Sequence, residues 1–133
     1  MVETVKKYYA LDNNCAETLT WAGNEAYNLG LDAKCVKLLS AFGAGCGCGH
    51  ICGALAGCLA TIGSLAVVER AHVTPDFGAL CAEFMAKFEA ELGSTMCNEL
   101  KPKYRTEEAK CVKTCELAGQ VLADFVAEKG LAK

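Results

Sequence analysis

Apolar residues recur at intervals of three or four positions along most of the chain, and this spacing predicts amphipathic helices. The clearest case runs from residue 77 to residue 92. Five apolar side chains there share one helical face: Phe77, Leu80, Phe84, Phe88 and Leu92. No segment shows the alternation of apolar and polar residues that is typical of a half-buried strand. The pattern therefore predicts an all-α fold.

Capping residues indicate where the helices begin and end. Asn14 followed by Glu17 forms a capping box, and Gly130 is typical of the residue just after a helix. Further caps are predicted at Asp32, Thr74, Ser94 or Thr95, and Thr106, with Pro75 in the first turn after Thr74. The expected helices cover residues 2–10, 15–28, 33–42, 51–70, 75–92, 96–100 and 107–129. Since 96–100 is a single turn, we expect a compact bundle of about five to six helices.

One segment interrupts the helical pattern, because glycine occupies every second position from 43 to 49. It reads Gly43-Ala44-Gly45-Cys46-Gly47-Cys48-Gly49-His50. Alternate glycines disfavour a helix and permit positive φ at several positions. The residues that follow, 51–68, carry no charge. The sequence therefore predicts a Gly/Cys-rich loop that leads into a buried central helix.

The composition is that of one globular domain covering residues 1–133. Charged residues make up 22% of the chain and the net charge is −3. Lysines lie among glutamates and aspartates rather than in a basic stripe, so we expect no nucleic-acid binding. Residues 51–68 are long enough for a membrane span, but their glycines and cysteines fit a buried helix better. We expect no membrane association.

Ten cysteines in 133 residues require an explanation. They could form a disulfide framework, bind metal, or carry out thiol–disulfide chemistry. The first nine residues are charged and amphipathic, and they lack the basic and apolar regions of a signal peptide. We therefore expect a cytoplasmic protein, in which cysteines stay reduced and serve as metal ligands or redox thiols.

Several cysteines lie where the predicted helices begin. Cys15, Cys52 and Cys97 fall in first turns, and Cys46 and Cys48 lie in the glycine-rich loop. Backbone N–H groups and the helix dipole stabilise a thiolate at such positions, so we expect lowered thiol pKa values. The thiolate is the form that binds metal and attacks disulfides. These five cysteines are therefore candidate metal ligands.

The other cysteines divide into two groups. Cys111 and Cys115 are four residues apart on the last predicted helix, so both sulfurs share one face and join the candidate ligands. Cys35, Cys58 and Cys81 lie among apolar neighbours and are expected to be small buried core residues.

Known metal-binding spacings are absent from the sequence. No Cys-x-x-Cys pair occurs, which disfavours a zinc ribbon and c-type haem, and neither compact ferredoxin spacing is present. His50 could ligate metal, donate a hydrogen bond to sulfur or face solvent. His72 is expected on the surface.

Four blocks of the sequence, taken together, resemble a known family. They are Asn14-Cys15-Ala16-Glu17, Cys52-Gly53-Ala54-Leu55-Ala56-Gly57, Gly93 to Leu100 around Cys97, and Cys111 with the apolar helix after it. The chain resembles the redox-active proteins named for a Cys, then Gly-Cys-Ala-x-x-Gly, then two further Cys. The middle block reads Cys-Gly-Ala here, and Cys46, Cys48 and Cys115 lie outside the signature.

This resemblance implies a small, mostly helical redox protein, typical of anaerobic bacteria or archaea. With the cysteine positions, it favours an iron–sulfur cluster, 4Fe–4S or larger. The core ligands would be Cys15, Cys52, Cys97 and Cys111, and Cys46, Cys48 and Cys115 would complete a larger or second site. Such a protein would transfer electrons to a redox partner protein or sense redox state.

Two other functions stay open at this point. One is a thiol–disulfide oxidoreductase, the enzyme class that these cysteines allow. The other is a thiolate-rich bundle that stores or delivers copper or zinc. The apolar helix at 51–68 could pack against a copy of itself, so a homodimer also stays open.

Overall fold

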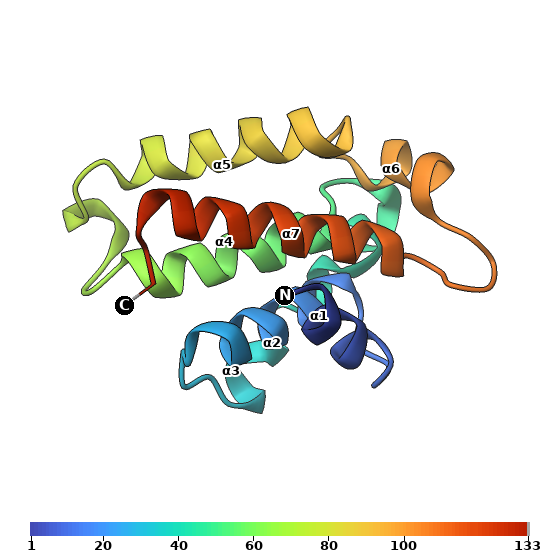
Figure 1. Ribbon diagram of the computed structural model, residues 1–133, viewed down its shortest axis with the longest axis horizontal. Coiled ribbons are helices and arrows are strands. Elements are labelled where there is room, and N and C mark those ends of the chain that lie inside the picture. The colour runs from blue at the N-terminus through green and yellow to red at the C-terminus, as the bar shows by residue number, and fades with distance from the viewer. Residues whose placement is uncertain (133) are drawn as a thin grey trace.

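Seven α-helices account for the regular structure of residues 1–132, the part of the chain that the computed structural model describes (Figure 1). They are α1 (Val2–Tyr9), α2 (Cys15–Tyr27), α3 (Ala33–Lys37), α4 (Gly53–Ala66), α5 (Phe77–Leu92), α6 (Cys97–Tyr104) and α7 (Val112–Lys129). Short helical turns lie at Ser40–Phe42 and Ala71–Val73, and a wider turn at Gly45–Gly49. The all-α prediction is confirmed, although the bundle has seven helices rather than five to six.

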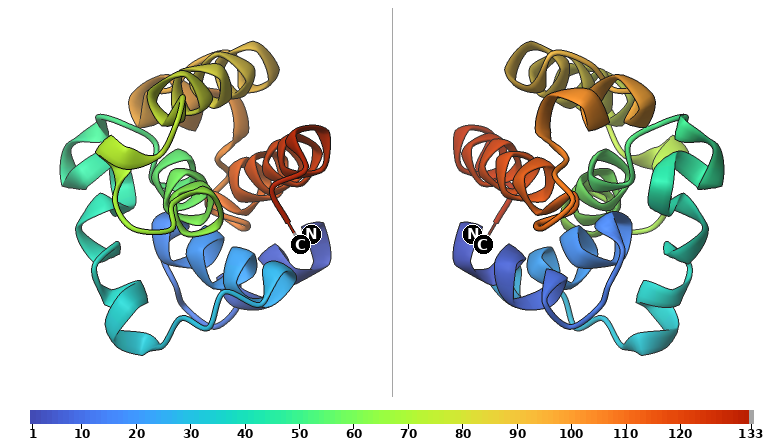
Figure 2. Two further views of the ribbon diagram at one scale, coloured as in Figure 1. Left: turned by 90° about the vertical axis from the view of Figure 1, so that its left-hand side faces the viewer. Right: turned by 90° about the vertical axis from the view of Figure 1, so that its right-hand side faces the viewer.

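The helices form three layers. α4 and α7 lie in the middle, α5 covers one side of them, and α1 and α2 cover the other (Figures 1 and 2). α7 contacts α1, α2, α4, α5 and α6, and α2 makes its most extensive contacts with α4. α7 therefore ties the layers together. None of the described helices combines the length and the apolar character that a membrane span requires.

Aromatic residues fill the core between α5 and α7. Phe84, Phe88 and Phe125 are fully buried. The rings of Phe84 and Phe125 meet edge to face with centroids 5.1 Å apart, and those of Phe84 and Phe88 lie 6.3 Å apart. Burying each ring contributes about 1.5–3 kcal/mol. The apolar face predicted for residues 77–92 is confirmed, with Phe77 and Leu80 at its partly buried edge.

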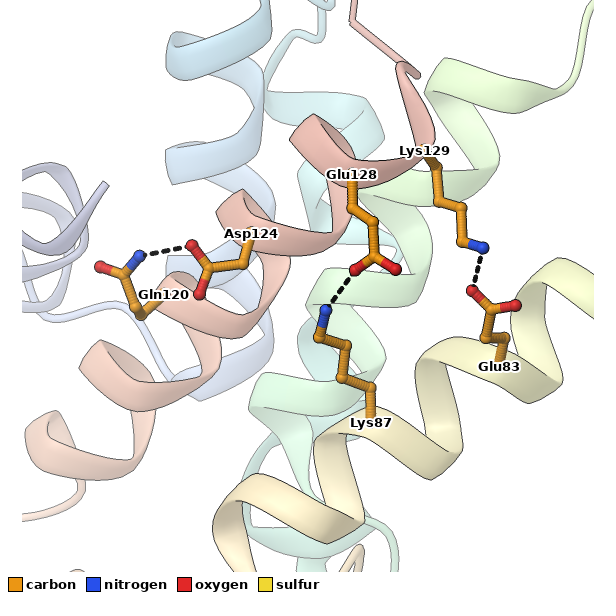
Figure 3. Close-up of polar contacts among 6 residues, drawn as sticks. All are labelled: Glu83, Lys87, Gln120, Asp124, Glu128 and Lys129. Carbon is orange, nitrogen blue, oxygen red and sulfur yellow. Dashed lines mark hydrogen bonds and ion pairs between the residues drawn. The ribbon is translucent and has the colours of Figure 1, made fainter.

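Charged pairs flank this core on the outer faces of α5 and α7. Lys87 pairs with Glu128 and Lys129 with Glu83, while Gln120 donates to Asp124 along α7 (Figure 3). The two ion pairs join the C-terminal half of α7 to α5, whereas the Gln120–Asp124 hydrogen bond lies within α7.

Glycines allow α2 and α4 to pack closely. A Cβ at Gly57 would lie 2.6 Å from the Ala16 carbonyl oxygen, and one at Gly53 would lie 3.4 Å from the Cys15 Cβ. Larger residues would force the two helices apart. The close approach brings the start of α2 beside the start of α4. It also buries most of α4, as predicted, although this helix covers 53–66 rather than 51–70.

The predicted helix 33–42 was too long. α3 ends at Lys37, and Val36 is its buried residue, so the neighbouring Cys35 is exposed. The prediction that Cys35 is a buried core thiol is therefore wrong. The predicted cap is correct, because the Asp32 carboxylate accepts a hydrogen bond from the Cys35 N–H at 3.0 Å.

Two predicted helix starts were also wrong. Thr106 does not open the last helix; its hydroxyl accepts from the Ala109 N–H at 3.0 Å, and its backbone pairs with Lys110 in a tight turn. These hydrogen bonds satisfy the groups that would otherwise start a helix, so α7 begins at Val112. Likewise, Asp76 has a φ of 58°, which delays α5 to Phe77.

α6 is longer than the predicted turn 96–100. It runs past Pro102 to Tyr104, whose hydroxyl donates to the Leu92 carbonyl at 2.8 Å. This bond ties the end of α6 to the end of α5.

Candidate functional site

Four cysteines at four helix starts line one cavity of about 270 Å³. Cys15 and Cys97 are the first residues of α2 and α6, and Cys52 and Cys111 directly precede α4 and α7. The starts of α4, α6 and α7 lie at the right-hand end of the molecule in Figure 1. Three of these helix starts, at Cys15, Cys52 and Cys97, were predicted from the sequence. They converge in space with Cys111, which was predicted to lie inside the last helix.

A short pair of extended segments sets Cys52 beside Cys97. Ile51 and Met96 form an isolated antiparallel bridge. The Cys52 N–H donates to the Thr95 carbonyl at 2.8 Å, and the Cys97 N–H donates to the His50 carbonyl at 2.6 Å. Because these bonds lie directly before α4 and α6, the two helices start side by side.

Gly45 closes the loop against this bridge. Its φ is +62°, and a Cβ there would lie 2.5 Å from the His50 nitrogen and 2.6 Å from the Cys97 Cβ. Positive φ is confirmed at five positions of the loop: Ala44, Gly45, Cys46, Gly47 and Gly49. The loop therefore packs directly against Cys97.

Separate contacts hold Cys15 and Cys111. The capping box is confirmed: the Glu17 N–H donates to Asn14 Oδ1 and the Asn14 N–H to Glu17 Oε1, each at 2.9 Å. The Cys111 N–H donates to the Tyr9 hydroxyl at 2.9 Å, which joins α1 to the start of α7. The thiols of Cys15 and Cys111 are within hydrogen-bond reach of each other, and Cys115 also contacts Cys15.

The expectation of lowered thiol pKa values at helix starts is wrong for Cys15, Cys52 and Cys97. Burial raises the pKa of Cys52, although the N–H groups of Leu55 and Ala54 lower it as a helix start should. Burial also raises the pKa of Cys97 and outweighs the nearby Lys101. The helix-start effect is thus present but smaller than desolvation.

Contacts with other thiols have the largest effects on the pKa values of Cys15 and Cys111. The hydrogen bond to Cys111 lowers the pKa of Cys15, but a hydrogen bond to Cys115 and burial raise it by more. The hydrogen bond to Cys15 and burial raise the pKa of Cys111, against a lowering contribution from Arg105. The raised pKa values favour the neutral form of all four thiols.

Cations surround the same cavity. Lys101, Arg105 and Lys110 line it, and none of them forms an ion pair with a carboxylate in residues 1–132. Arg105 is close enough to the Cys111 thiol to lower its pKa. In a chain with a net charge of −3, this is a local positive field that favours negative charge inside the cavity.

The remaining candidate ligands lie elsewhere. Cys46 and Cys48 are exposed on the loop and do not line the cavity. Cys115 is fully buried one helical turn beyond Cys111. His50 is exposed and contributes its backbone carbonyl to the site, as described above.

The cysteines predicted to be core residues have mixed outcomes. Cys58 is fully buried, as predicted, and its thiol donates to the Ala118 carbonyl at 3.6 Å. Cys81 is only partly buried.

Sequence reasoning missed the polar lining of the cavity. Lys101 and Arg105 follow Cys97 at intervals of four residues, a helical spacing that could have placed them near it. Tyr9 and Thr114 carried no such signal, since their position depends on how α1 and α7 pack. Within the described residues, no three His, Cys, Asp or Glu side chains are arranged to hold a single metal ion.

Comparison with known protein families gives one match. The family model described as "Putative redox-active protein (C_GCAxxG_C_C)" matches residues 13–126, a range that contains all four cavity cysteines. No curated protein and no solved structure matched the chain. The resemblance inferred from the four cysteine blocks is confirmed, and the chain belongs to this family of redox-active proteins.

Proposed function

We propose that this protein binds an iron–sulfur cluster in the cavity and uses it for electron transfer or redox sensing. The ligands would be Cys15, Cys52, Cys97 and Cys111. The observation that carries the proposal is that four cysteines from four separate helix starts surround one cavity.

The donor set suits such a cluster. Thiolates are the usual ligands of iron–sulfur clusters, and in a 4Fe–4S cluster each of the four thiolates binds a different iron atom. Sulfurs distributed around a cavity therefore fit a cluster better than a single ion, which would need all its ligands to meet at one point.

The rest of the lining fits the same group. Iron with sulfide and four thiolates carries a net negative charge, and Lys101, Arg105 and Lys110 supply unpaired positive charge around it. Tyr9 fixes the backbone at Cys111, and Gly45 fixes it at Cys97. Such contacts orient the ligands and influence reduction potential.

The four thiols, whose pKa values are raised, must release their protons when metal binds. When bound, the cluster would supply a one-electron redox couple. The chain's own residues hold it, shield it and balance its charge.

Anaerobic purification from iron-replete cells tests the proposal. We expect a brown protein that contains iron and acid-labile sulfide and gives an EPR signal in one oxidation state. Cys52→Ser and Cys97→Ser should each lose most of the iron. Cys35→Ser removes an exposed cysteine outside the cavity and should keep it. A colourless, iron-free preparation of the unsubstituted protein would rule out the cluster.

One contact favours a second candidate, a thiol–disulfide oxidoreductase. Cys15 and Cys111 are within hydrogen-bond reach of each other, so they could close to a disulfide by exchange with an external organic disulfide. Alkylation followed by mass spectrometry separates the two functions. Bound metal protects all four cavity thiols until it is removed, whereas an exchange site would lose only Cys15 and Cys111 on oxidation.

A further inference from the structure

Cys46 and Cys48 are a pair of exposed cysteines that the proposed cluster does not use. They lie at the tip of the glycine-rich loop with only Gly47 between them. We infer that they form a redox-active dithiol, which exchanges with external organic disulfides by closing to a Cys46–Cys48 disulfide.

The backbone brings the two cysteines within bonding range. Residues two positions apart are separated by at most about 7 Å in an extended chain. Here Gly47 (φ 76°, ψ 1°), the residue between them, turns in the left-handed region, which shortens that separation. Disulfides join residues whose Cα atoms lie roughly 4.4–6.8 Å apart. The two thiols can therefore be joined with little movement of the loop.

The loop is also held in this shape. The His50 N–H donates to the Gly45 carbonyl at 2.9 Å, and Gly45 packs against Cys97. Positive φ is unfavourable for a residue with a side chain, yet Cys46 adopts it at the loop tip. A fixed loop thus presents a thiol at a position where glycine would be less strained.

External disulfides can reach the pair from solvent. Both cysteines are exposed, and no atom lies within 4 Å of the point where a Cβ on Gly47 would be. The Cys48 Sγ lies 3.5 Å from the Gly45 carbonyl oxygen, to which the protonated thiol donates. Because that contact engages the Cys48 thiol, Cys46 is the thiol left to attack an external disulfide.

The exchange proceeds in two balanced steps. In the first, the Cys46 thiolate bonds to one sulfur of the external disulfide, the sulfur–sulfur bond breaks, and one thiolate leaves. In the second, Cys48 bonds to the Cys46 sulfur, and the mixed disulfide breaks to release the second thiolate. The protons lost by Cys46 and Cys48 end on the two released thiols. The protein pair is oxidised and the external disulfide is reduced.

Redox titration of the full-length protein in glutathione buffers tests this inference. Samples are equilibrated without oxygen, quenched with acid, alkylated and mapped by mass spectrometry. The ratio of reduced to oxidised glutathione is held constant while the total concentration falls tenfold. Because two glutathione thiols are released for each disulfide consumed, the ratio of Cys46–Cys48 disulfide to dithiol should rise about tenfold.

Single substitutions of the two cysteines distinguish the thiol that attacks the external disulfide from the thiol that closes the internal one. Cys48→Ser should accumulate a glutathione adduct on Cys46, and Cys46→Ser should form no internal disulfide in this peptide. Cys35→Ser removes another exposed cysteine and should leave the transition unchanged. Separate glutathione adducts on Cys46 and Cys48, in a proportion that does not change on dilution, would overturn the inference. So would two thiols that stay fully alkylatable throughout.

This result is independent of the proposed cluster. Because neither cysteine lines the cavity, Cys46→Ser and Cys48→Ser should keep the iron content of the unsubstituted protein. Loss of the dithiol transition with iron retained contradicts only this inference, and absence of iron with the transition intact contradicts only the proposed function.

Discussion

The two halves of α7 differ in what surrounds them. Its C-terminal half packs Phe125 against Phe84, and its outer charges are paired with those of α5 (Figure 3). Its N-terminal end borders a cavity lined by cysteines and by cations without carboxylate partners among residues 1–132. The C-terminal half pairs its charges with those of α5, whereas the surroundings of the N-terminal end contain thiols and cations without such partners.

This difference indicates where stability and chemistry reside. Apolar burial at the C-terminal half does not depend on anything bound. The N-terminal end places neutral thiols and unpaired positive charge around an open space, an arrangement that a bound anionic group would complete. Substitutions in the two halves should therefore have separable effects on unfolding and on binding.

Phe125→Ala should give the largest change. Removing a fully buried ring should lower the free energy of unfolding by about 3–5 kcal/mol, as measured by urea denaturation. Val68→Ala is the control, because Val68 is 98% exposed and its loss should change stability by less than about 0.5 kcal/mol. The folded fraction of the Phe125→Ala protein should keep its iron. Iron loss while helicity is intact would show that the two halves are not independent.

Gly45→Ala should affect the opposite end. The new Cβ would collide with the His50 backbone and the Cys97 side chain, so we expect about 1–3 kcal/mol of destabilisation and reduced iron binding. Gly47→Ala is a matched control, since Gly47 also has positive φ but no neighbour within 4 Å of its Cβ position. Equal losses in the two variants would mean that φ strain, and not the contact with Cys97, is responsible.

Raising the pH should destabilise the metal-free protein through its buried thiols. Burial raises the pKa of Cys58 in the folded state, so its contribution is complete below the unfolded thiol pKa of about 8.5 and is lost above it. The loss should approach about 1.4 kcal/mol per pH unit for this group. Urea midpoints between pH 7 and 10 should therefore fall less steeply for Cys58→Ala. Parallel curves for the two proteins would contradict this account.

Arg105→Gln tests whether the unpaired cations act on a bound redox centre. Removing positive charge favours the oxidised, less negative state, so the reduction potential should fall by an amount on the order of tens of millivolts. Lys87→Gln removes a cation from the outer face of α5 and α7, and should leave the potential unchanged. A potential that does not respond to Arg105→Gln would place the redox centre elsewhere.

The smallest effect should come from the ion pair of Lys87 and Glu128. Both side chains are partly exposed, so a double-mutant cycle with Lys87→Ala and Glu128→Ala should give a coupling energy of about 0.2–1 kcal/mol. High salt should reduce it further. A coupling energy well above this range would mean that the α5–α7 contact depends on its charges as well as on its core.

Local signals predicted the fold class and several helix ends. The caps at Asn14 and Asp32 and the C-terminal Gly130 depend on neighbouring residues alone, and all three are confirmed. The helix start predicted at Thr106 was wrong because its hydroxyl accepts a hydrogen bond within a tight turn instead. The prediction that Cys35 is buried was wrong because α3 is so short that only one of its side chains, Val36, is buried.

The candidate site was only partly predictable for a different reason. The helix-start positions of Cys15, Cys52 and Cys97 follow from local patterns, so they could be predicted. The cavity itself depends on how α1, α2, α4, α6 and α7 pack. The raised thiol pKa values likewise depend on the depth of burial, which no local pattern contains.

The hydrogen bond from the Cys111 N–H to the Tyr9 hydroxyl has a consequence for biogenesis. It joins the first helix of the chain to the last, so the cavity exists only after α7 has been synthesised and has docked on α1. A nascent chain that lacks α7 has at most three of the four thiols in place. Whatever occupies the cavity can therefore enter only once α7 has been made and has docked, and truncation before residue 111 would abolish loading even though residues 1–110 contain eight of the ten cysteines.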